Sequence, residues 1–157
     1  MGGEQQIRSI VQTHGWAVIR VEGDDLEADY AYSIGLFEGM QHPEIIIFGL
    51  PLDTMQQIIN SIGEEVRKGK VFSAGSTSED VLDGYLCAFR EVAPAAVRYY
   101  MGGAVEYYGG EVASLHCIWP DRRGRFPWDP EASATFRQLQ PMLSEGPEAS
   151  TNIRPAS

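Results

Sequence analysis

The spacing of apolar residues along the chain predicts several short strands and one long helix. Residues 16–21, 28–36, 84–92 and 112–119 have the pattern of strands, and the β-branched run 44–49 predicts a strand buried on both faces. Residues 53–68 predict a helix, with Asp53 as its expected N-terminal cap. The apolar face expected to pack on the sheet consists of Met55, Ile58, Ile59, Ile62 and Val66.

Shorter helices are predicted near residues 4–13, 94–101 and 132–139, and the remaining polar and glycine-rich stretches are expected to be loops: 39–43, 75–80 and 102–110. Short turns join the first three strands, so these strands should pair antiparallel. The predicted class is α+β, a single domain over residues 1–143 with a mainly antiparallel sheet of about five strands and a long helix on one face. Residues 144–157 are poor in apolar side chains and are predicted to be a disordered tail.

Charge and length exclude several classes of function. The 157 residues suit one domain, and 22 acidic against 12 basic residues give a net charge of −10. This charge opposes binding to nucleic acid or to an anionic membrane surface, and no apolar run approaches the ~20 residues that span a bilayer. The first residues lack the pattern of a signal peptide, and the two cysteines lack metal or redox spacing. We therefore expect a cytoplasmic protein without nucleic-acid or membrane partners.

The stretch 119–129 carries the highest density of candidate chemistry. Its prolines exclude a helix interior or a central strand, so it predicts a structured loop with aromatic anchors and charged tips. Loops held on a rigid scaffold often carry function. Together with one strand tyrosine, its residues form the set of candidate ligand-binding residues: Tyr32, Trp119, Arg123, Arg125, Trp128 and Asp129.

The spacing of His116, Cys117 and Arg123 matches the His-Cys-x5-Arg signature of Cys-dependent phosphatases. Pro120, however, removes an N–H that a phosphate-binding loop needs, and no glycine eases a tight wrap. No helix is predicted to start after Arg123 and offer its N-terminus to a phosphate. We interpret the match as coincidence and Cys117 as a core residue of a strand.

His42, Pro43 and Glu44 enter the buried strand and form a second candidate. A histidine and a glutamate at a sheet end can serve as an acid–base pair or as two metal ligands. The alternative is a turn in which Glu44 caps nearby N–H groups and His42 is solvated. The three histidines, which include His14 and His116, have no zinc-site spacing, so no metal site is predicted.

We expect the two candidate loops to meet. His42 precedes the third strand and Asp121 follows the last one, so antiparallel strands would place both at one edge of the sheet. The resulting polar site would use His42, Glu44 and Asp121 as catalytic candidates. The alternative is a cluster of salt bridges that locks the loops.

Several short motifs occur together in a characteristic order. They are His14-Gly15-Trp16, Tyr30-Ala31-Tyr32-Ser33-Ile34-Gly35-Leu36, His42-Pro43-Glu44, Phe48-Gly49-Leu50, Asn60, Gly69, Trp119-Pro120-Asp121 and Phe126-Pro127-Trp128-Asp129. From about His14 to Asp129 the chain resembles the domain-of-unknown-function family 4262. The resemblance implies a bacterial protein with that family's architecture and no assigned activity or cofactor. The chain departs from the family at His116, where glutamine is more frequent, and at Cys117, which is outside the family's pattern.

Three functions remain open at this stage. The incomplete catalytic set and the acidic charge favour a small-ligand or protein-binding accessory module, and homo-oligomerisation stays open. Polar residues at the predicted sheet ends favour an enzyme acting on a small molecule. The order of elements also resembles that of flavin-reductase-like split barrels, which implies a flavin- or nucleotide-binding protein, although fold alone does not establish function.

Overall fold

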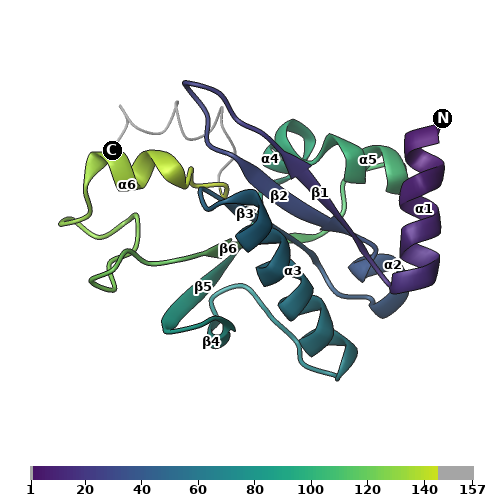
Figure 1. Cartoon of the computed structure of the whole chain (residues 1–157), viewed down its shortest axis with the longest axis horizontal. Helices are drawn as coiled ribbons and strands as arrows, with labels where there is room; N and C mark the ends of the chain where they lie inside the picture. The colour runs from purple at the N-terminus through teal and green to yellow at the C-terminus, as the bar shows by residue number, and fades with distance from the viewer. Residues whose placement is uncertain (1, 145–157) are drawn as a thin grey trace.

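The computed structural model describes residues 2–144, which form one six-stranded sheet with helices on both faces (Figure 1). The elements are α1 (Gly2–His14), β1 (Ala17–Val21), β2 (Tyr30–Ile34), α2 (Leu36–Met40), β3 (Glu44–Phe48), α3 (Leu52–Arg67), β4 (Thr77–Leu82), β5 (Tyr85–Glu91), α4 (Pro94–Tyr100), α5 (Gly102–Tyr108), β6 (Ser114–Ile118) and α6 (Ala134–Leu139). The tail predicted to be disordered lies, except for Ser144, outside the described residues.

The strands follow the order β1-β2-β3-β6-β5-β4 across the sheet. All neighbours pair antiparallel except β3 and β6, which are parallel, with Glu44 opposite Ser114 and Ile46 opposite His116. The α+β class and the antiparallel pairing of the first three strands are confirmed. The expected mainly antiparallel sheet of about five strands is matched only roughly, because the sheet has six strands and is mixed. The expectation that β3 and the last strand run in opposite directions is wrong. The long connection between β3 and β6 allows a parallel pair, which short turns would not.

Three elements occur where loops were expected. β4 lies in the polar stretch around residue 78 and forms an edge strand whose register against β5 is irregular. The short helices α2 and α5 occupy stretches rich in glycine. Each of these elements has little apolar periodicity of its own, so the sequence carries no local signal for it. Pairing with the backbone of β5 holds β4 in place, and tertiary packing holds the two helices.

Helix α3 packs against one face of the sheet with the predicted side chains, since Ile59 and Ile62 have no exposed surface. This face also holds Trp16 and Phe89 in one continuous apolar cluster. The expected cap is wrong: the helix begins at Leu52 without a side-chain cap, and Asp53 pairs with Arg20 at 3.0 Å.

The opposite face of the sheet is covered by α1, α4 and α5 rather than left to solvent (Figure 1). Its apolar cluster joins Ile34, Ile46 and Phe48 of the sheet to Val11 of α1 and Val97 of α4. A sheet covered on both faces buries its central strands completely, as the predicted double burial of β3 requires. None of the helices in the described part is both long and apolar enough to cross a membrane.

Candidate functional site

Glu44, the first residue of β3, is completely buried and surrounded by hydrogen-bond donors. The Ser33 hydroxyl donates to its Oε1 at 2.6 Å, the Gly35 N–H donates to its Oε2 at 2.9 Å, and the Tyr108 hydroxyl donates to Oε2 as well. The N–H groups of Leu36 and Phe37 complete this set of donors, which we call the Glu44 cage. Burial raises the pKa of Glu44, while the surrounding donors oppose that shift. The cage fixes the turn from β2 into α2.

His42 is also buried, and both of its ring nitrogens are engaged. Nε2 accepts the N–H of Phe72 at 3.0 Å, so the ring proton lies on Nδ1 and is donated to the Pro43 carbonyl at 2.9 Å. The interpretation of His42 as a solvated residue is therefore wrong. The interpretation of Glu44 as a cap of nearby N–H groups is confirmed. His42 ties the segment after α3 to the entrance of β3.

Asp121 organises the loop after β6. Its Oδ1 accepts the N–H groups of Arg123 and Arg125 at 2.9 Å, and its Oδ2 accepts Nε of Arg125 at 2.9 Å. These donors, the Arg125 N–H first among them, lower the pKa of Asp121. The carboxylate thus closes a turn and neutralises one arginine of the loop.

The two candidate loops do not meet. Because β3 and β6 are parallel, the entrance of β3 and the exit of β6 lie at opposite ends of the sheet. In Figure 1 the segment after β6 extends toward the left, with α6, whereas α2 and the entrance of β3 lie at the right. The expectation of one site shared by His42, Glu44 and Asp121 is wrong, because it depended on antiparallel pairing of these two strands.

Most of the other candidate residues make contacts within the fold. Asp129 accepts the N–H of Phe126 at 2.7 Å, and the ring of Trp128 stacks on Phe126 while Arg90 lies 3.8 Å from the Trp128 centroid. The hydroxyl of Tyr32, on the opposite face from α3, accepts the N–H of Gly103 at 3.0 Å. Of the predicted ligand-binding set, Trp119 lines the pocket at the exit of β6.

A pocket of about 450 Å³ opens at the exit of β6, and we call it the Trp119 pocket. The ring of Phe136 meets that of Trp119 edge-on at a centroid distance of 5.2 Å. The side-chain amide of Gln140 accepts the backbone N–H of Trp119 and donates to the backbone carbonyl of Trp119. Asp121 and Arg122 lie among the lining residues, which are Leu50, Leu82, Tyr85, Trp119, Pro120, Asp121, Arg122, Ser133, Thr135, Phe136 and Leu139. Sequence reasoning missed the walls from β4, β5 and α6, which no local motif connects to Trp119.

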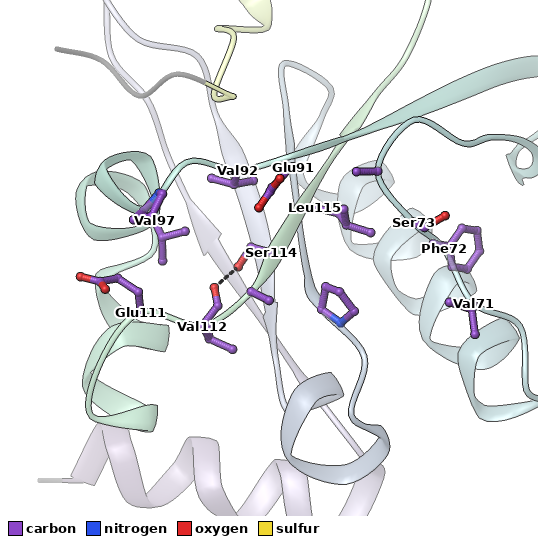
Figure 2. Close-up of a pocket in the computed structure, with 14 residues that line it drawn as sticks. Val71, Phe72, Ser73, Glu91, Val92, Val97, Glu111, Val112, Ser114 and Leu115 are labelled. Carbon is purple, nitrogen blue, oxygen red and sulfur yellow. Dashed lines mark hydrogen bonds between the residues drawn. The ribbon is translucent and has the colours of Figure 1, made fainter. Parts of the chain in front are cut away.

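A second pocket of about 450 Å³ lies at the other end of β6, where β5 ends and β3 and β6 begin (Figure 2). We call it the Glu91 pocket. Pro43 connects it to the loop of His42, and Phe72, whose N–H is bound by His42, forms part of one wall. Sequence reasoning did not identify this pocket, because its walls come from segments far apart in the chain.

Cys117 differs from a catalytic thiol. Cys87 and Cys117 lie on neighbouring strands, both are buried, and they form no disulfide. Their contact, together with burial, raises the pKa of Cys117 well above its usual value, which disfavours the thiolate that a nucleophile requires. Across residues 2–144, no group of three His, Cys, Asp or Glu side chains is placed to hold a metal ion.

Comparison with protein families identifies the chain's relatives. The family described as "Domain of unknown function (DUF4262)" matches residues 10–133, most of the chain. The protein belongs to the DUF4262 family. Comparison with curated proteins and with solved structures returned no match. Family membership confirms the resemblance found in the sequence and assigns no activity.

Several motifs shared with DUF4262 pack against one another in this structure. A Cβ at Gly35 would lie 2.8 Å from the Gly15 carbonyl oxygen and from Cα of Trp16. Trp16 in turn donates its indole N–H to Asn60 at 2.9 Å, and Gly35 donates its own N–H to Glu44. These motif residues, separate in the sequence, form one packed cluster that joins α1, β2, β3 and α3.

His116 is expected to make the stability of this DUF4262 protein depend on pH. It is buried, its Nε2 has no hydrogen-bond partner within the described part of the chain, and burial with the nearby Arg90 charge lowers its pKa from 6.5 to about 3. The folded state therefore keeps His116 neutral, and its contribution to stability is complete above pH 6.5 and is lost as the pH falls from 6.5 toward 3.

We expect this one group to lower the free energy of unfolding by ~2 kcal/mol between pH 7 and pH 5. His116→Gln, which replaces the imidazole with a side chain that does not titrate, should remove this part of the acid sensitivity. Urea denaturation of both proteins at pH 7 and pH 5 measures the difference. An equal loss in the two proteins would show that His116 is not the group responsible.

Proposed function

We propose that this protein is a binding module and that the Trp119 pocket holds a small molecule with an apolar body and an anionic end. One observation carries the proposal: a pocket of about 450 Å³ lined largely by aromatic and aliphatic side chains has Arg122 on its rim. This volume falls within the range of roughly 300–1,000 Å³ that is typical of small-molecule sites. Trp119 and Phe136 supply flat surfaces for the body of the ligand.

Charge at the rim favours an anion. Asp121 is neutralised by Arg125 at 2.9 Å and by the N–H groups of its own turn. Arg122, in contrast, forms no ion pair with any residue from 2 to 144. A carboxylate on the ligand can therefore pair with the Arg122 guanidinium, which suits that geometry.

The hydrogen bonds of the catalytic candidates support binding in preference to acid–base chemistry. His42 has both ring nitrogens engaged with backbone groups, and Glu44 has both oxygens inside its cage. A general base must be free to reach the proton that it removes. In this protein, reaching a substrate would first require these residues to give up contacts that hold β3 and α2.

Two fragments with the same body test the proposal: 4-phenylbutyrate and 4-phenylbutylamine. We expect 4-phenylbutyrate to shift the indole N–H signal of Trp119 in nitrogen-15 NMR spectra, with the signal of Trp16 unchanged. Arg122→Gln should weaken the binding of 4-phenylbutyrate about threefold, the effect of a single exposed ion pair. The matched control is Arg123→Gln, because Arg123 is equally charged and exposed but does not line the pocket.

A blocking variant tests the location independently of charge. Thr135 is exposed on α6 and lines the pocket, so Thr135→Trp should fill it and weaken binding at least tenfold. Ala134→Trp places the same side chain at an exposed neighbour that does not line the pocket. If 4-phenylbutyrate leaves Trp119 unchanged, or binds Thr135→Trp as well as the natural protein, the Trp119 pocket is not its site.

A further inference from the structure

The Glu91 pocket is a second concave site whose walls come from both faces of the sheet. Its floor is formed where β5 and β6 meet, and one wall is α4 on one side of the sheet (Figure 2). The opposite wall is the segment 71–74 that follows α3. The full lining is Pro43, Val71, Phe72, Ser73, Ala74, Glu91, Val92, Pro94, Val97, Glu111, Val112, Ala113, Ser114 and Leu115.

Hydrogen bonds within the chain hold these walls in place. His42 fixes the backbone of Phe72 at 3.0 Å, and the Gly75 N–H donates to the Phe89 carbonyl at 2.8 Å. On the floor, the Val92 N–H donates to the Ser114 carbonyl at 3.0 Å. A pocket that is already formed loses little conformational entropy when a ligand enters.

The apolar lining leaves few polar groups for recognition. The Ser114 hydroxyl donates to the Val112 carbonyl at 2.9 Å. Glu111 pairs with Arg98 at 2.8 Å, and Figure 2 shows Glu111 at the outer side of the pocket, beside Val112. These two side chains are therefore already occupied by partners within the fold.

Glu91 is the remaining charged group of the lining. Figure 2 shows it near Val92 and Leu115, over the floor of the pocket, and no lysine or arginine belongs to the lining. Within residues 2–144, no basic side chain pairs with Glu91. The pocket thus combines an apolar surface with one uncompensated negative charge, in a chain of net charge −10.

We infer that the Glu91 pocket binds a small amphipathic amine, a molecule with an apolar body and one protonated ammonium group that pairs with Glu91. The body lies on Val71, whose side chain is 73% exposed, and on the exposed Ala74 and Pro94. The buried side chains of Val97, Leu115 and Phe72 complete the apolar lining. Few polar groups against a broad apolar lining is the usual composition of a small-molecule site. The inference is independent of the Trp119 pocket, which lies at the other end of β6 and has the opposite charge on its rim.

The same two fragments test this site through different signals. We expect 4-phenylbutylamine to shift the methyl signals of Val97 and Leu115 in carbon-13 NMR spectra, and 4-phenylbutyrate to leave them unchanged. Glu91→Gln should weaken the binding of the amine about threefold, as expected for one exposed ion pair. Glu79→Gln is the matched control, because it changes the net charge equally at an exposed position of β4 outside the pocket.

A blocking pair separates the pocket from the general acidity of the protein. Ala74 is exposed and lines the pocket, so Ala74→Trp should weaken amine binding at least tenfold, whereas Thr77→Trp, exposed and outside the lining, should not. Equal weakening by Glu91→Gln and Glu79→Gln would overturn the proposal, since it would indicate attraction to the overall charge. Binding of the peptide acetyl-Leu-Lys-Leu-amide more than tenfold tighter than the amine would also overturn it and indicate a protein partner.

The tests of the Glu91 pocket do not depend on the proposal for the Trp119 pocket. Arg122→Gln and Thr135→Trp should leave the binding of 4-phenylbutylamine to the Glu91 pocket unchanged. Glu91→Gln and Ala74→Trp should leave the binding of 4-phenylbutyrate unchanged. Either site can therefore fail in these measurements while the other is supported.

Discussion

Glu44→Ala is expected to prevent this protein from folding stably at 25 °C. The substitution removes both acceptor oxygens of the Glu44 cage and leaves the donors on Ser33, Gly35 and Tyr108 without their partner. Each buried donor left unsatisfied costs ~1–3 kcal/mol, and the N–H groups of α2 lose the same acceptor. A total of roughly 5 kcal/mol or more would equal or exceed the stability of many small domains.

Thermal melting followed by circular dichroism, together with the dispersion of amide NMR signals, measures this effect. Glu44→Gln keeps the shape and one acceptor oxygen, so it should fold with a lower melting temperature. Glu106→Ala is the control, since Glu106 is an exposed glutamate on α5, the helix that carries Tyr108, and ordinary surface substitutions change stability by about 0.5 kcal/mol or less. A Glu44→Ala protein that melts like the natural one would show that the cage does not hold α2 in place.

The sequence predicted best those elements whose own side chains carry a regular pattern. The apolar face of α3 is an example, because Ile59 and Ile62 recur at helical spacing and are buried as expected. The strand Glu44–Phe48 is another, because its short run of β-branched apolar residues predicts a strand buried on both faces, and all five of its residues are buried. β4 was missed because its polar residues show no such pattern and its pairing with β5 supplies the order.

The candidate site was predicted less well because its geometry depends on pairing between distant strands. The parallel register of Ile46 with His116 decides which loops share an end of the sheet, and no local signal encodes it. The two pockets were missed for the same reason, because each is lined by segments that are distant in the sequence. Trp119 and Phe136 come from separate segments, as do Phe72 and Glu91. The residue types in the sequence indicated which side chains could carry chemistry. Which residues lie next to those side chains could be determined only from the fold.

Gly35→Ala should destabilise the protein by roughly 4 kcal/mol, for two physical reasons that add. Gly35 has a φ of 125°, a conformation that side-chain-bearing residues rarely adopt. A Cβ at this position would also lie 2.8 Å from the Gly15 carbonyl oxygen and from Cα of Trp16, which are backbone atoms that cannot move aside singly. Any shift of Gly35 also disturbs its N–H bond to Glu44 and weakens the Glu44 cage.

Gly69→Ala separates these two causes. Gly69 has a φ of 104°, close to that of Gly35, but a Cβ there meets no atom within 4 Å, so only the backbone conformation is strained. We expect a loss of about 1 kcal/mol for this control, which is typical of a left-handed residue gaining a Cβ. Urea denaturation of both variants measures the difference. Equal losses would show that backbone conformation alone requires glycine at position 35, and that the close packing of the Gly15, Trp16 and Gly35 motifs adds nothing to stability.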